Sequence, residues 1–65
     1  MFEKWQEDAL THLFVMNGRN PIDTQTIIGE FPFLHWYGIG LNPYQAAERA
    51  AVTLWPDRFP TKRKP

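Results

Sequence analysis

The hydrophobic pattern of residues 2–16 predicts an amphipathic helix. At 100° per residue the apolar positions fall on one narrow stripe, and charged residues such as Glu3 and Glu7 fall away from it. Asn17 and Gly18 follow directly, and both tolerate the left-handed conformation that ends many helices. We therefore expect the first helix to end at residue 16. Its apolar stripe consists of Phe2, Trp5, Ala9, Leu13 and Met16.

A second, shorter helix is expected over residues 24–29. Asp23 is placed as its N-cap, and Ile22 before the cap can pack on Ile27 as a hydrophobic staple. Gly29 is expected to end it after little more than one turn. The competing interpretation is a strand, because β-branched residues alternate with others in this stretch. These residues are Ile22, Thr24, Thr26 and Ile28.

The last helix is predicted over residues 43–55. Asn42 is a capping residue followed by proline at the first helical position, and Gln45 completes a capping box. Pro56 halts the helix. Its alanines make it thin, so another helix can approach closely; they are Ala46, Ala47, Ala50 and Ala51. Its apolar stripe is predicted to be Tyr44, Ala47, Ala51, Leu54 and Trp55.

Residues 31–37, Phe-Pro-Phe-Leu-His-Trp-Tyr, are the most unusual local feature. Pro32 prevents a helix from running through the segment but can begin one. Residues 31–41 are therefore predicted to form an aromatic loop or a short helical turn, which Gly38 and Gly40 interrupt. One interpretation is that the aromatic residues fill the gap between the first and last helices.

The other interpretation makes part of this segment a binding surface. Tryptophan and tyrosine are enriched at binding hot spots because each combines a rigid ring with one hydrogen-bonding group. We expect His35, Trp36 and Tyr37 to face a partner. The remaining apolar residues are expected to point inward; they are Phe31, Phe33 and Leu34.

Together these elements predict an all-α fold, a small three-helix domain over residues 1–57 with an irregular basic tail over residues 58–65. The chain has 65 residues and no cysteine, so neither a disulfide nor a thiolate zinc site can stabilise it. Aromatic residues make up 15% of the sequence, and a domain this small has difficulty hiding all of them. Some rings are expected to remain exposed.

The formal net charge is zero, but the basic residues gather at the C-terminus. Basic tails bind phosphates through charge, although many only keep a protein soluble. The sequence therefore carries a second hypothesis, a nucleic-acid-binding accessory protein that uses the tail and the outer face of the last helix. The residues concerned are Gln45, Arg49, Arg58, Lys62, Arg63 and Lys64.

Residues suited to catalysis are scarce. The sequence contains no serine and no cysteine, which removes the usual nucleophiles. Asp8 and His12 are four residues apart and are best interpreted as a surface pair, since two ligands do not make a metal site. We expect no enzymatic activity, no cofactor and no bound metal.

The preferred hypothesis is a small non-enzymatic module that docks on a larger protein. By analogy of size and missing catalytic chemistry, it would be an inhibitor of phage or mobile-element type. A third hypothesis is a self-associating subunit, a homodimer paired through the alanine face of the last helix. No stretch is long and apolar enough to cross a membrane, and no signal peptide is apparent, so a cytoplasmic location is expected.

Overall fold

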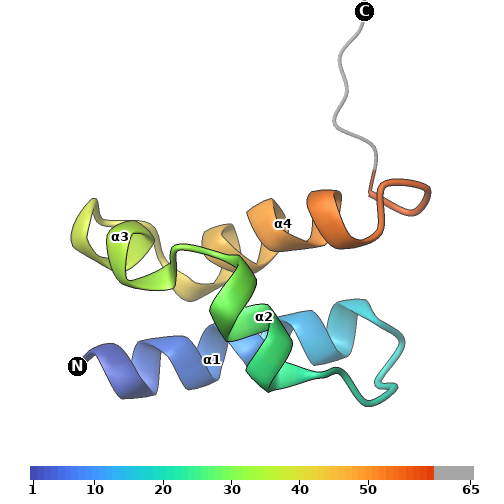
Figure 1. The fold of residues 1–65 in the computed structure, drawn as a ribbon, viewed down its shortest axis with the longest axis horizontal. Coiled ribbons are helices and arrows are strands. Elements are labelled where there is room, and N and C mark those ends of the chain that lie inside the picture. The colour runs from blue at the N-terminus through green and yellow to red at the C-terminus, as the bar shows by residue number, and fades with distance from the viewer. Residues whose placement is uncertain (60–65) are drawn as a thin grey trace, which may run out of the picture.

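Four helices packed around one small core form the part of the protein that the computed structural model describes, residues 1–59 (Figure 1). The predicted all-α class is confirmed. The helices are α1 (Phe2–Met16), α2 (Thr24–Glu30), α3 (Phe33–Gly38) and α4 (Pro43–Leu54). Within residues 1–59, no helix combines the length and the apolar character that a membrane span requires.

Helix α1 has the predicted bounds and the predicted face. Trp5, Ala9 and Leu13 of its apolar stripe are buried in the core. The helix ends where the sequence indicated, because Gly18 takes a left-handed backbone conformation with φ of 69°. Arg19 is left-handed too, with φ of 62°, and its backbone N–H donates to the carbonyl of Phe14. The left-handed conformation of Arg19 was not predicted.

Residues 24–30 form a helix, so the strand interpretation of this stretch is wrong. Asp23 caps it as predicted, since its side chain accepts from the backbone N–H of Thr26 at 3.2 Å. Gly29 does not end α2, which continues to Glu30 and stops where Phe31 becomes extended before Pro32. A residue before proline is driven out of the helical region, and here that effect ends the helix.

Helix α3 is the short helical turn that the sequence offered as one of two alternatives for residues 31–41. Pro32 stands at its N-cap, and the backbone N–H of Trp36 donates to the Pro32 carbonyl at 3.0 Å. Six residues are too few for a helix to persist alone in water, so its packing against the rest of the molecule stabilises it. Gly40, with φ of 92°, reverses the chain towards α4.

The capping box of α4 is present as predicted. The backbone N–H of Gln45 donates to Asn42 Oδ1 at 2.8 Å, and the backbone N–H of Asn42 donates to Gln45 Oε1 at 3.0 Å. All four alanines of α4 are fully buried. Tyr44 was placed on the buried stripe, but about half of its side chain is exposed. The buried face of α4 is therefore centred on the alanines rather than on the larger residues.

Helices α1 and α4 lie against one another and run in the same direction, with α2 crossing in front of them in Figure 1. The small alanine side chains of α4 allow its backbone to approach α1 closely. Helix α3 packs on the N-terminal half of α1, where the Trp5 and Phe33 rings meet edge to face with centroids 6.2 Å apart. The Trp5 indole N–H also donates to the Leu41 carbonyl at 2.8 Å, which joins α1 to the segment before α4.

Candidate functional site

Large apolar side chains are exposed on α3 and directly after it. Leu34 is 65% exposed, Ile39 is 56% exposed and Tyr37 is 38% exposed, and His35 is exposed between them. Leu34, His35 and Tyr37 belong to α3, and Ile39 follows it directly. We call them the α3 outer face. Contiguous apolar patches on a small protein mark binding sites more often than isolated exposed side chains do.

Trp36 does not belong to this face, and the prediction that it points towards a partner is wrong. Its side chain is only 9% exposed, and its ring contacts Phe33 at 5.5 Å and Phe31 at 6.0 Å between centroids. Leu34 was expected to point inward, and this too is wrong. Trp36 is therefore buried where Leu34 was expected, and Leu34 is exposed where Trp36 was expected. The prediction that Phe33 points inward is confirmed.

The signal that could have found this arrangement is the helical spacing inside the segment. Phe33 and Trp36 are three residues apart and share one side of a helix, which leaves Leu34 and Tyr37 to share another. The sequence allowed either a loop or a helical turn for residues 31–41. This spacing assigns side chains to faces only if the segment is helical. Ile39 lies just beyond α3 and was not singled out by the sequence.

The N-terminus of α1 extends the α3 outer face at its Tyr37 edge. The Phe2 and Tyr37 rings meet edge to face with centroids 5.5 Å apart, and Tyr37 also contacts Trp5 at 5.6 Å. Met1, next to Phe2, is 88% exposed. The rigid Tyr37 ring is therefore supported from behind by α1 while its other side faces solvent, which is the arrangement of an aromatic binding anchor.

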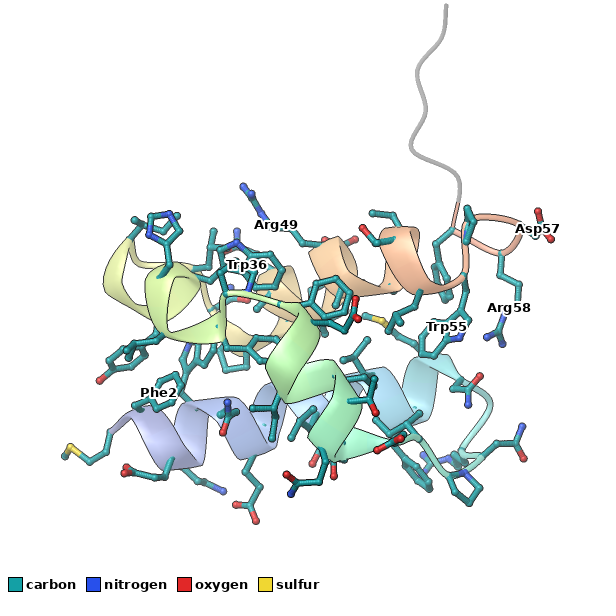
Figure 2. The ribbon with its side chains drawn as sticks, in the orientation of Figure 1. Phe2, Trp36, Arg49, Trp55, Asp57 and Arg58 are labelled. Atoms are coloured by element: carbon teal, nitrogen blue, oxygen red, sulfur yellow. The ribbon has the colours of Figure 1, made fainter. Side chains whose placement is uncertain are left out.

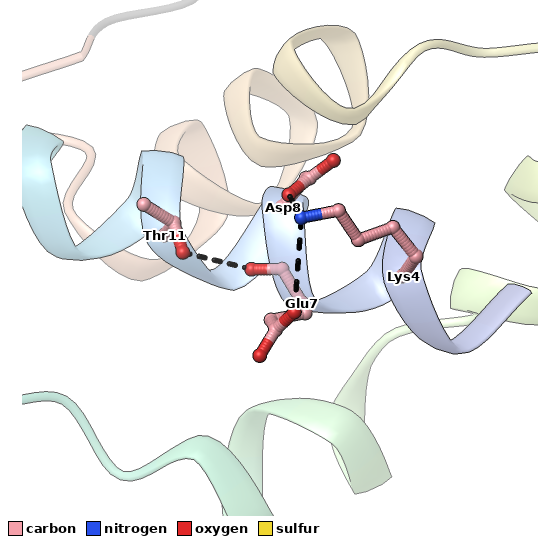
Figure 3. A network of polar contacts seen from close by, with 4 residues as sticks. All are labelled: Lys4, Glu7, Asp8 and Thr11. Atoms are coloured by element: carbon pink, nitrogen blue, oxygen red, sulfur yellow. Dashed lines mark hydrogen bonds and ion pairs between the residues drawn. The ribbon is translucent and has the colours of Figure 1, made fainter.

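The polar face of α1 carries a small network of polar contacts (Figure 3). Lys4 Nζ lies 3.3 Å from Asp8 Oδ1 and 4.0 Å from Glu7 Oε1, and Thr11 Oγ1 donates to the Glu7 carbonyl at 3.0 Å. Asp8 thus pairs with Lys4 and not with His12, whose ring instead meets Tyr44 at 5.5 Å. Surface pairs of this kind contribute little stability.

No metal-binding group of three or more His, Asp or Glu side chains occurs within residues 1–59. The Asp23 carboxyl, which caps α2, has a lowered pKa. The Thr26 hydroxyl donates to Asp23 Oδ2 at 2.7 Å and holds the pKa of that carboxyl below its ordinary value. The lowered pKa of Asp23 thus results from its role as the N-cap of α2.

The basic residues of the nucleic-acid hypothesis do not gather on one described surface. The side-chain oxygen of Gln45 accepts a hydrogen bond from the Asn42 backbone N–H in the capping box. Arg49 points up from α4 in Figure 2, whereas Arg58 points down towards the turn after α1. Arg49 lines a shallow groove of about 320 Å³ together with Glu48, whose charge opposes its own. Lys62, Arg63 and Lys64 lie outside the described residues.

The alanine face of α4 is occupied within the chain. Ala46, Ala47, Ala50 and Ala51 have no exposed surface, because α1 packs on α4. The expectation that a helix can approach this face closely is confirmed, but the helix is α1 of the same chain. A second copy could pair through these alanines only after α1 and α4 had separated.

Residues 58 and 59 pack on the helical body. Phe59 contacts the core, with its ring 6.0 Å from that of Trp55. The Arg58 guanidinium lies 4.8 Å from the centre of the Trp55 ring, and Arg58 Nη2 donates to Asn17 Oδ1 at 2.8 Å. These contacts join the end of the described chain to the turn after α1.

Compared with protein-family models, curated proteins and solved structures, the chain matches none of them.

Proposed function

We propose that this protein is a small non-enzymatic binding module that docks on a larger protein through the α3 outer face. The observation that carries the proposal is the exposure of Leu34 and Tyr37 on α3, and of Ile39 directly after it, while Phe33 and Trp36 of the same helix are buried. Transferring such apolar surface from water into an interface is favourable by about 25 cal/mol per Å².

Two further properties support docking over catalysis. The sequence lacks the serine and cysteine nucleophiles, and the polar groups of α1 lie on an exposed helix surface instead of converging in a cleft. The Tyr37 ring is also held by Phe2 and Trp5. A ring that is ordered before binding loses less conformational entropy when a partner covers it.

The finer form of the proposal is an inhibitor of phage or mobile-element type that acts in the cytoplasm. It is supported by analogy alone: a short chain without nucleophiles that exposes an apolar face is suited to blocking a surface on another protein.

Affinity capture from an extract of the native host tests docking. Leu34→Asp places a charge in the centre of the α3 outer face, and Leu34 is exposed enough that the fold tolerates the change. The matched control is Val15→Asp, because Val15 is also exposed but lies at the far end of α1. We expect the captured protein to be lost with Leu34→Asp and retained with Val15→Asp.

Two results would contradict the proposal. One is retention of every captured protein by the Leu34→Asp variant. The other is capture of nucleic acid alone, released by salt, which would favour the nucleic-acid hypothesis instead.

A further inference from the structure

A pocket of about 240 Å³ opens where the start of α2 meets the C-terminal end of α4. Trp55 marks this end of the molecule in Figure 2, and Phe2 marks the opposite end. Apolar side chains form most of the pocket wall, namely Ile22, Ile27, Leu54 and Trp55. Pockets for small-molecule ligands usually measure about 300–1,000 Å³. This one is suited to a single large side chain from another protein.

Arg58 lies beside the pocket and contacts two of the residues that line it. Its guanidinium stacks on Trp55 at 4.8 Å and donates to Asn17 at 2.8 Å, and both of these residues line the pocket. Among residues 1–59, Arg58 forms no ion pair with a carboxylate. A guanidinium carries five N–H donors in a planar fork, so the donors left over can hold a carboxylate in a bidentate pair.

Asp23 places a negative charge on the α2 side of the same pocket. Its carboxylate is turned to its own helix, since Oδ1 accepts from Thr26 N and Oδ2 from the Thr26 hydroxyl. The two charges are thus held by different elements, Asp23 at the start of α2 and Arg58 after α4. A carboxylate in a bound peptide is attracted to the Arg58 side and repelled from the Asp23 side.

We propose that this pocket binds an acidic peptide segment of a partner protein, with one large apolar side chain inserted against Trp55 and a neighbouring carboxylate paired with Arg58. The charge of Arg58 selects the acidic segment, and the volume of the pocket selects the single apolar side chain. The inference rests on the proposed function in that the ligand is a protein segment, but it uses none of the residues of the α3 outer face.

Nuclear magnetic resonance of the full chain with capped tripeptides tests this site, with the indole N–H of Trp55 as the reporter. The probes are acetyl-Glu-Leu-Glu-amide, acetyl-Lys-Leu-Lys-amide and acetyl-Glu-Ala-Glu-amide. We expect the first to shift the Trp55 signal and to bind about fivefold more tightly than the lysine peptide. It should also bind about tenfold more tightly than the alanine peptide, because alanine leaves the apolar pocket unfilled.

Charge variants sharpen the test because they act in opposite directions. Arg58→Gln should remove the preference for the glutamate peptide over the lysine peptide, and Arg58→Lys should keep part of it, since lysine retains the charge without the planar fork. Asp23→Asn should strengthen binding of the glutamate peptide while preserving the cap of α2, because asparagine is also a good N-cap. Leu34→Asp is the matched control and should leave binding unchanged.

Three results would overturn the inference. They are an unchanged Trp55 signal at about 5 mM glutamate peptide, tighter binding of the lysine peptide, and a Trp55 shift that follows protein concentration without any peptide. The last would identify a second copy as the occupant. If the glutamate peptide binds and the Leu34→Asp variant still captures every protein, the docking proposal fails and the pocket proposal is supported. If the peptide does not bind and capture is lost with Leu34→Asp, only the pocket proposal fails.

Discussion

At the scale of single residues, Trp36 and Leu34 have opposite roles although they are two positions apart. Trp36→Ala removes a buried ring from the cluster with Phe31 and Phe33, and such truncations cost about 3–5 kcal/mol. A domain of this length has about that much stability in total, so we expect the variant to be largely unfolded. Leu34→Ala should change stability by less than about 0.5 kcal/mol, because the side chain is mostly exposed.

Urea unfolding followed by circular dichroism checks this pair, and Trp36→Phe serves as a control that keeps a ring in the cluster. If Trp36→Ala and Leu34→Ala were equally stable, the burial of Trp36 in the core would be contradicted.

Asp23 makes stability depend on pH in one direction. Its hydrogen bonds with Thr26 hold its folded-state pKa below that of the unfolded chain, where an aspartate titrates at about 3.9. Its contribution to stability is therefore fully present above the unfolded pKa and is lost as pH falls through the folded pKa. We expect the urea midpoint to fall more steeply below about pH 4 in the natural chain than in Asp23→Asn. Parallel midpoints over that range would contradict the capping role.

At the scale of elements, α3 and the turn after it differ in what they require of glycine. Gly38 is within the helix and a Cβ there meets no atom within 4 Å, so Gly38→Ala should stabilise the protein by about 0.4–1 kcal/mol. Gly40 has φ of 92°, which side chains rarely adopt, so Gly40→Ala should destabilise it by about 1–2 kcal/mol. Thermal unfolding of the two variants gives the comparison, and a shift of the same sign in both would contradict this account of the turn.

At the scale of the whole molecule, Arg58 and Phe59 hold the end of the described chain against the turn after α1 and against the core. Arg58 bonds to Asn17, 41 residues earlier, and Phe59 contacts the core. The double variant Arg58→Ala/Phe59→Ala should therefore lose about 1–2 kcal/mol of stability. The control is Asp57→Ala, which alters an exposed neighbour and should be neutral. Equal urea midpoints for both variants would show that these contacts do not stabilise the fold.

The residues of the candidate site could be predicted only in part from the sequence, and α3 shows the reason. His35 and Tyr37 were placed on the exposed side correctly, while Trp36 and Leu34 were exchanged. Hydrophobic character could not separate the latter two, since both are large and apolar. Only the direction in which α3 packs on α1 decides which of them is covered.

The sequence by itself determined the local features: the bounds of α1, the Asp23 cap, the capping box of α4 and the all-α class. These follow from side chains that bond or pack within a few residues of their own position. The tertiary structure decided which alanine face α1 occupies, which side of α3 remains outside, and that Arg58 reaches back to Asn17. Each of these three features depends on contacts between residues that are far apart in the sequence, and a local sequence pattern does not predict such contacts.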